Sequence, residues 1–309
     1  MVEEDLKTKI AWLYFMEGMT QDEVAKKLGM TRARVLRILG SARNDGTVQI
    51  KVSTRFSQSI ELENELEKAF DLERAIVVPE PDEPSKVTEI IGKTLGIYLT
   101  ETLSNNMTIG LGWGNTLTYA LNTIESLDHK DSNIISLLGA LNKVTNVNPS
   151  EFAWRVADRL SASCYMMSVP VFAPDAETRK ALFQHNGISE VYERAHDLDL
   201  AVLSVGDLDV DSAYSKYDLL TPAELSSLKR AGAVGDILCH FVNNDGETID
   251  HPVNKRTFSV GFETISKSKR IVLASGGQNK KNVMKAAMRR VNPNVVITDV
   301  LVAKHLLGR

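Results

Sequence analysis

The sequence contains little of the material from which disulfide frameworks and zinc sites are built. Its 309 residues include only two cysteines, Cys164 and Cys239, which lie far apart and in no CxxC pair. This arrangement excludes a disulfide scaffold and suits a reducing compartment. The histidines at positions 185, 196, 240 and 251 show no metal-ligand spacing. We therefore expect no metal and interpret both cysteines as small core residues.

Long apolar runs are also missing. The segment MVEEDLKTK at residues 1–9 is acidic and has no hydrophobic core, so no signal peptide is predicted. Residues 103–124 are interrupted by Asn, Thr and Gly and do not form a membrane span. A hydrophobic content of 43% and a charged content of 25% are ordinary for a globular protein, and the length favours two domains. We expect a cytoplasmic protein with no membrane partner.

What the sequence does contain is a helix-turn-helix pattern, TQDEVAKKLGMTRARVLRIL, at residues 20–39. Thr20 and Glu23 match a capping box at the start of a short helix, and Gly29 permits the positive φ angle that ends it. Thr31 then caps a second helix. Apolar side chains recur at helical spacing along both helices: Val24, Ala25, Leu28, Val35, Ile38, Leu39 and Ala42.

Three arginines of the second helix, Arg32, Arg34 and Arg37, lie away from this apolar face. They occupy the part of a recognition helix that meets DNA, where arginine pairs with guanine or neutralises a phosphate. Residues 24–55 contain eight basic residues and one acidic residue, although the whole chain has a net charge of −4. We therefore predict that this segment binds DNA. The alternative is an ordinary solvated pair of helices.

Further patterns complete a small N-terminal domain. Residues 6–16 carry apolar side chains at helical spacing and predict a first helix. Asp45-Gly46 predicts a turn, and the alternation at residues 47–52 predicts a strand, the wing of a winged helix-turn-helix. Residues 59–70 predict a helix that acts as a linker or in dimerisation. The predicted domains are residues 1–54, which bind DNA, and residues 55–309.

The second domain shows the pattern of a parallel sheet. Near-continuous apolar runs recur at residues 75–78, 108–111, 134–138, 165–171, 200–205, 271–274 and 295–298, and helical segments separate most of them. Strands of this kind are buried on both faces. The predicted fold class is therefore α/β with a mainly parallel sheet, and the loop PEPDEPS at residues 79–85 lies inside this domain.

Polar, glycine-rich turns follow several of these strands. GLGWGNT, at residues 110–116, joins a strand to a helix, and its amides with the side chains of Asn115 and Thr116 can surround an anion. It lacks the GK[ST] of a P-loop and the third glycine of a dinucleotide fingerprint. The alternative is a tight turn that requires glycine. Trp113, inside this loop, either packs in the core or flanks the pocket.

Three other turns are predicted at strand ends. Gly139 follows the strand at residues 134–138, GAVGD at 232–236 offers the carboxylate of Asp236, and SGGQNK at 275–280 supplies Lys280. Ligands bind outside the carboxyl ends of strands in open α/β sheets. We therefore predict one pocket in which Lys280 neutralises a phosphate and Asp236 accepts hydrogen bonds from sugar hydroxyls. A solvated surface role is the alternative for each residue.

With these motifs in this order, the chain resembles the SorC family of bacterial sugar-responsive transcriptional regulators. The resemblance spans nearly the whole length and includes SGGQNKKNVMKAAM at residues 275–288 and VVITDVLVAKHLL at 295–307. It implies a winged helix-turn-helix joined to an effector domain similar to sugar-phosphate isomerases and deaminases. It also implies homotetramers on DNA that a phosphorylated sugar or sugar alcohol (polyol) releases or rearranges.

Carried over by position, the resemblance assigns two sets of residues. The residues that it assigns to contacts with DNA are Tyr14, Gln21, Thr31, Arg32, Arg34 and Arg37. The effector pocket is assigned to Gly112, Gly114, Asn115, Thr116, Gly139, Asp236 and Lys280. Two features depart from the family: Ala140 stands where many members have a second glycine, and Leu138 rather than a lysine precedes Gly139, so no covalent imine with the effector is predicted.

Three functions are compatible with these observations. The main hypothesis is a regulator of a carbohydrate or polyol catabolic operon that a phosphorylated effector controls. The second is a sugar-phosphate isomerase or deaminase with an accessory DNA-binding domain, since fold alone does not determine function. Against it, the sequence has no GxSxG motif, no Ser/His/Asp set and no acid/base pair beyond Asp236, and no cofactor is predicted. The third is a constitutive DNA-binding oligomer that responds to no ligand.

Overall fold

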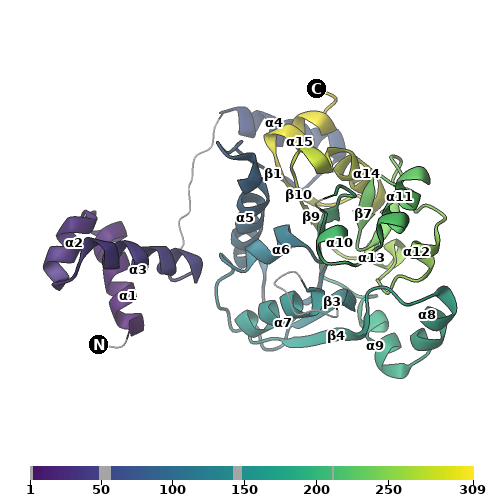
Figure 1. The fold of residues 1–309 in the computed structure, drawn as a ribbon, viewed down its shortest axis with the longest axis horizontal. Helices are drawn as coiled ribbons and strands as arrows, with labels where there is room; N and C mark the ends of the chain where they lie inside the picture. Colours follow the sequence, from purple (N-terminus) through teal and green to yellow (C-terminus); the bar gives the residue numbers. More distant parts are fainter. Residues whose placement is uncertain (1–2, 49–56, 142–147, 211) are drawn as a thin grey trace. The chain divides into compact units, whose positions relative to one another are not determined.

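A computed structural model describes residues 3–48, 57–141, 148–210 and 212–309 of the chain. The chain divides into two compact units, Met1–Thr54 and Arg55–Arg309 (Figure 1). Across the described ranges, no helix combines the length and the apolar character that a bilayer crossing requires.

The N-terminal unit contains helices α1 (Glu3–Ala11), α2 (Gln21–Leu28) and α3 (Arg32–Asn44). The helix predicted at residues 6–16 is divided, because beyond Ala11 the backbone continues as a π-type turn, η1 (Trp12–Met16). A small apolar core joins these elements and consists of Ile10, Leu13, Val24, Ala25, Val35 and Leu39. Most of the strand predicted at residues 47–52 lies outside the described residues, and Thr47 and Val48 form a bend.

The capping hydrogen bonds confirm both predicted helix starts. Thr20 Oγ1 accepts from the Glu23 amide at 3.3 Å, and the Thr20 amide donates to the Glu23 carboxylate at 2.7 Å. Gly29 follows α2 with a φ of +63°, a left-handed conformation that favours glycine. Thr31 Oγ1 accepts from the Arg34 amide at 3.3 Å and begins α3. Local sequence therefore fixes the turn between the two helices.

The C-terminal unit is built on a seven-stranded parallel sheet with the order β1-β10-β9-β5-β2-β3-β4. Its strands are β1 (Arg74–Val78), β2 (Thr108–Leu111), β3 (Asn133–Ala140), β4 (Ser163–Pro170), β5 (Leu200–Leu203), β9 (Ile271–Ala274) and β10 (Val295–Asp299). Each apolar run noted in the sequence overlaps one of these strands. The predicted α/β class with a parallel sheet is confirmed.

A smaller antiparallel sheet contains β6 (Val205–Gly206), β7 (Gly235–Ile237) and β8 (His240–Val242), with β7 in the middle. The single strand predicted at residues 200–205 is therefore too long, because Ser204 separates β5 from β6. The prediction that Asp236 lies in a turn at the end of a parallel strand is also wrong. Asp236 lies within β7, where it pairs with Gly206 on one side and Phe241 on the other.

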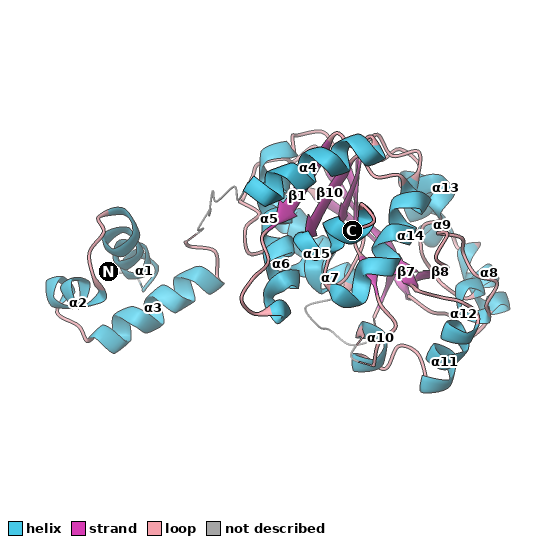
Figure 2. Cartoon of the chain, turned by 90° about the horizontal axis from the view of Figure 1, so that it is seen from above, coloured by secondary structure: helices cyan, strands magenta, loops and turns pink. Residues whose placement is uncertain are grey.

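Helices cover both faces of the parallel sheet (Figures 1 and 2). One face packs against α5 (Val87–Thr102), α6 (Asn115–Ala120) and α7 (Pro149–Leu160), and the other against α4 (Ser57–Phe70), α9 (Asn186–Arg194), α14 (Lys281–Val291) and α15 (Val300–Leu306). Along β5, Leu200 and Val202 face the first layer, whereas Ala201 and Leu203 face the second. This burial on both sides explains why the strands are continuous apolar runs.

Short helices complete the C-terminal unit: η2 (Pro84–Lys86), α8 (Ala176–Phe183), α10 (Ala213–Lys216), α11 (Pro222–Arg230), α12 (Pro252–Lys255), α13 (Phe262–Ile265) and η3 (Gln278–Lys280). Asp299 caps α15 by accepting from the amides of Leu301 at 2.8 Å and Val302 at 3.0 Å, as its position before an apolar run predicts. Both cysteines are free thiols; Cys239 is buried and Cys164 is half-buried.

The β1 edge of the sheet is closed by α4. The carboxylates of Glu63 and Glu67 accept hydrogen bonds from the amides of Val77 at 3.0 Å and Ala75 at 2.9 Å. Without these acceptors, the two amides would be unpaired donors at a sheet edge. The helix predicted at residues 59–70 therefore covers an edge strand. The strand order ends on the opposite side at β4.

Helices α5 and α6 approach each other closely through two glycines. A Cβ atom on Gly92 would overlap the carbonyl oxygen of Thr116, and one on Gly96 would overlap Thr123 Oγ1 and the carbonyl oxygen of Ala120. This contact holds α6, and with it the loop that precedes it, against α5.

We predict that Gly96→Ala destabilises the C-terminal unit by about 1–3 kcal/mol, the usual cost of overpacking a tight contact. Denaturant unfolding of the full chain checks this. Gly261→Ala is the matched control, because a Cβ there meets nothing within 4 Å, and its effect should stay within about 0.5 kcal/mol. Equal effects of the two substitutions would contradict the close contact.

Candidate functional site

A cavity of about 190 Å³ opens at the carboxyl ends of three neighbouring strands of the parallel sheet. Strand β5 lies between β2 and β9, and each of the three is followed by a segment that lines the cavity: residues 113–115 after β2, 204–207 after β5 and 279–280 after β9. Thr88 of α5 and residues 212–214 complete the lining. The cavity therefore lies where ligands bind in open α/β sheets.

Three of the predicted effector residues line this cavity: Gly114, Asn115 and Lys280. Gly114 directly precedes α6 and has a φ of +116°, a conformation that L side chains rarely adopt. Trp113 also lines the cavity. Its ring contacts Tyr214 edge-on with a centroid distance of 5.8 Å, so it both packs in the core and flanks the pocket.

Three other predicted residues are not part of the cavity lining. The Gly112 amide donates to the Val202 carbonyl at 2.9 Å and so continues the pairing of β2 with β5. Thr116 is buried, and its Oγ1 has no hydrogen-bond partner among the described residues. The prediction that Gly139 follows the end of its strand is wrong, because β3 continues beyond it and its amide donates to the Phe258 carbonyl at 2.9 Å.

Asp236 lies beneath the cavity rather than on its surface. It is 1% exposed; its Oδ2 accepts from the Cys239 amide at 2.8 Å, whereas Oδ1 has no partner in the described part of the chain. A Cβ on Gly206, which lines the cavity, would overlap Asp236 Oδ1, so the carboxylate lies directly behind this glycine. Burial raises the pKa of Asp236 to about 6, although the nearby Tyr214 hydroxyl and the charge of Lys280 lower it.

The carboxylate that does line the cavity is Asp207, which the sequence reasoning missed. Its Oδ2 accepts from Asn279 Nδ2 at 2.7 Å, and its Oδ1 accepts from the Asp209 amide at 3.0 Å. A glycine and then a carboxylate after the apolar run at 200–205 formed the pattern that could have identified it. Burial lowers the pKa of the Lys280 ammonium, and the charges of Asp207 and Asp236 partly oppose this effect.

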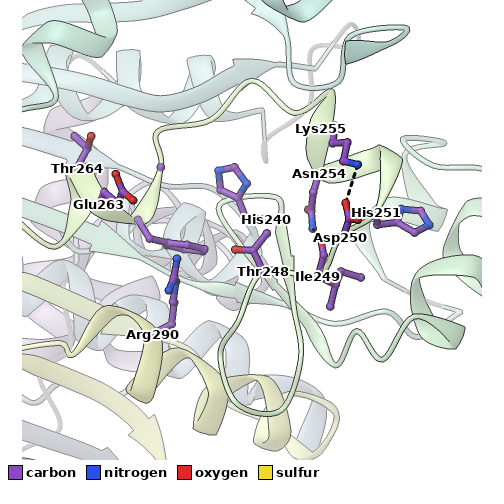
Figure 3. Close-up of a pocket in the computed structure, with 12 residues that line it drawn as sticks. His240, Thr248, Ile249, Asp250, His251, Asn254, Lys255, Glu263, Thr264 and Arg290 are labelled. Carbon is purple, nitrogen blue, oxygen red and sulfur yellow. Dashed lines mark hydrogen bonds and ion pairs between the residues drawn. The ribbon is translucent and has the colours of Figure 1, made fainter.

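A larger open depression, of about 570 Å³, contains none of the predicted residues (Figure 3). Its cations are already engaged, because Lys255 pairs with Asp250 at 2.7 Å and the Arg290 guanidinium lies 4.7 Å from the centre of the Phe262 ring. Burial lowers the pKa of His240, which also lines the depression, to about 4, so its ring is neutral at pH 7. The smaller cavity at the strand ends is therefore the candidate effector site.

Three of the predicted DNA-contacting residues, Tyr14, Gln21 and Arg32, line one open groove of the N-terminal unit. Arg32 Nε donates to Gln21 Oε1 at 3.4 Å, and its guanidinium lies 3.8 Å from the carboxylate of Asp22. Both Arg32 and Asp22 are well exposed, so this pair contributes little to stability and leaves the arginine free to exchange partners.

The first turns of α3 present the other predicted residues. Arg34 and Arg37 are exposed, whereas the Thr31 hydroxyl is used as the helix cap. Leu36, which the sequence reasoning did not identify, is 56% exposed on the same helix. Apolar side chains in this setting can contact the methyl group of thymine. The helix therefore offers both cations and an apolar side chain to a partner.

Residues 54–308 match the family model described as "Putative sugar-binding domain". The chain belongs to the SorC family of sugar-responsive transcriptional regulators. It is 28% identical over 309 residues to the erythritol catabolism regulatory protein EryD of Brucella abortus, covering 99% of this chain and 98% of the relative. It is 25% identical over 308 residues to the deoxyribonucleoside regulator of Bacillus subtilis, with coverage of 99% and 98%.

The full-length sorbitol operon regulator SorC from Klebsiella pneumoniae has the same fold, with a TM-score of 0.73 at 21% identity, covering 99% of this chain and 100% of that one. Each of these three relatives of the SorC-family chain is named as a regulator or regulatory protein. The hypothesis of a sugar-responsive regulator is thereby confirmed over that of an enzyme.

We predict that Asp236→Asn stabilises the unliganded protein at pH 7. The carboxyl has a pKa of about 6 in the folded state, compared with 3.8 when unperturbed, so the folded state binds the proton more tightly. The wild-type protein therefore loses stability as the pH rises from about 4 to about 6, and an uncharged amide does not. Denaturant unfolding should show a larger advantage of the variant at pH 7 than at pH 5. A stability advantage of the variant that does not change with pH would contradict the raised pKa of Asp236.

Proposed function

We propose that this protein binds the operator of a carbohydrate or polyol catabolic operon, and that a phosphorylated sugar or polyol controls its affinity for that DNA. The observation that carries the proposal is that Lys280 lines the cavity at the strand ends together with Gly114 and Asn115. The names of the relatives support a polyol, since EryD is named for erythritol catabolism and SorC for the sorbitol operon.

In this proposal the phosphate lies at Lys280, where the partly desolvated ammonium attracts an anion, and the amides of Gly114 and Asn115 donate to it. The open space at Gly114 supports this role, because this glycine lines the cavity and a Cβ atom on it would meet nothing within 4 Å. The hydroxyl groups of the ligand point towards Asp207, with Asp236 behind Gly206. Gly112, Thr116 and Gly139 act only indirectly, by shaping the strands and the helix around the cavity.

The N-terminal unit supplies the contacts with DNA. Helix α3 enters the major groove, with Arg34 and Arg37 on bases or phosphates, while Tyr14, Gln21 and Arg32 contact the adjacent backbone, and Thr31 fixes the start of the helix. The excess of basic over acidic residues in the segment 24–55 supports the role.

Effector and DNA are coupled through the assembly. We propose a cytoplasmic homo-oligomer, a tetramer, in which recognition helices from different subunits meet separate half-sites. A ligand changes DNA affinity only to the extent that it binds two assembly states unequally. A modest change in the spacing of the helices is then sufficient to misalign them with the operator.

We predict that Arg37→Ala weakens binding to DNA fragments selected by the wild-type protein from a randomised pool, by about 1–3 kcal/mol for a base contact. Fluorescence anisotropy at fixed salt measures this. Arg230→Ala is the control, because it removes the same charge from an exposed position on α11. If both variants lose affinity equally, the arginine of α3 makes no specific contact.

We predict that Lys280→Met abolishes the thermal shift produced by phosphorylated polyols. A ligand at about 100 times its Kd stabilises a protein by roughly 2.7 kcal/mol, which raises the midpoint by several degrees. Each polyol is tested with and without its phosphate group. Lys281→Met, which changes the neighbouring lysine outside the cavity lining, should retain the shift. Shifts from the free polyols alone, or from no compound, would overturn the proposed phosphate site.

A further inference from the structure

The charges around the cavity define the effector more narrowly than the proposed function does, and this inference rests on that function. Among the described residues that line the cavity, Lys280 is the one cation and Asp207 the one carboxylate. We propose that Asp207 makes the cavity selective for effectors that carry a single anionic group and end in hydroxyl groups. Monophosphates of polyols fit this description, whereas bisphosphates and phosphorylated sugar acids do not.

The hydrogen bonds of Asp207 hold its carboxylate in one orientation. Asn279 Nδ2 donates to Oδ2 at 2.7 Å from the segment after β9, and the Asp209 amide donates to Oδ1 at 3.0 Å from its own loop. Each oxygen of a carboxylate accepts more than one hydrogen bond and donates none. Asp207 can therefore accept a ligand hydroxyl without giving up either partner, but it has nothing to offer a second anion.

The surrounding charges make a second anion unfavourable. The ammonium of Lys280 can neutralise one phosphate, and in doing so it is no longer available elsewhere in the cavity. A further carboxylate or phosphate on the ligand would then face Asp207. The carboxylate of Asp236 would also be near, because it lies behind Gly206 in the cavity lining. Like charges at close range in a partly enclosed site repel strongly, because little water separates them.

A hydroxyl at the same position has the opposite effect. It donates to the Asp207 carboxylate and completes a charge-assisted hydrogen bond, which is stronger than one between neutral groups. The side chain of Asn279 limits the movement by which Asp207 could avoid an anion. Selectivity therefore arises from a hydrogen bond gained by one ligand and a repulsion imposed on the other.

The test uses pairs of ligands that differ in this one group. Erythritol 4-phosphate, ribitol 5-phosphate and sorbitol 6-phosphate are each compared, by isothermal titration with the full chain, with the aldonic acid of the same length and phosphate position. For the chain length that binds best, the wild-type protein should prefer the polyol phosphate by at least about tenfold, the effect of one repulsive contact. Equal affinities within the pair would overturn the inference and leave the proposed function standing.

Asp207→Asn tests whether this carboxylate causes the preference. The amide is nearly isosteric, so the variant should bind the acid more tightly than the wild type does, and the preference within the pair should fall towards one. Asp209→Asn is the matched control, because it removes the same charge two residues away from an exposed side chain outside the cavity lining. A preference that survives in Asp207→Asn would assign selectivity to another group.

The wild-type comparison remains decisive if the variant unfolds, since it requires no substitution. Binding of no phosphorylated compound of any length by the wild-type protein would overturn both the proposed phosphate effector and this inference. Binding of polyol phosphates and their acids alike overturns only the inference, so the two failures are distinguishable.

Discussion

The hydrogen bonding of β5 between β2 and β9 is the constraint on which the candidate site depends. Parallel pairing in register aligns the carboxyl ends of the three strands, so that the segments after them converge on one cavity. Asn115, Asp207 and Lys280 are far apart in sequence and become neighbours only through this alignment. The close contact of α5 with α6 then fixes the first of these segments from outside the sheet.

The sequence predicted what depends on local patterns. Strands buried on both faces appeared as apolar runs, and the caps at Thr20 and Thr31 appeared as residue types at fixed spacing. It failed where long-range pairing decides the outcome. The glycines around Asp236 indicated a turn, but this segment pairs with Gly206 and Phe241 and forms a strand of the second sheet. Similarly, β3 extends through Gly139 because it pairs there with β4 and with the carbonyl of Phe258.

The candidate site was predictable in outline for the same reason. Lys280 and Asn115 line the cavity because each lies in the segment that follows a strand of the parallel sheet, and apolar runs in a sequence indicate where such strands end. Asp207 also lies in a segment after a strand of the parallel sheet. It belongs to no glycine-rich motif, however, so a search for motifs did not identify it. Asp236 belongs to a recognisable motif, but it lies beneath the cavity rather than on its surface. It can lie there because Gly206 has no side chain that would overlap its carboxylate.

Glu63 and Glu67 make one edge of the parallel sheet different from the other. Since their carboxylates accept from the amides of Ala75 and Val77, another strand could pair with β1 only after α4 moved away, while β4 ends the strand order on the opposite side. Pairing with a strand of another copy, the usual risk at an exposed sheet edge, is therefore disfavoured at β1 by a pair of glutamates.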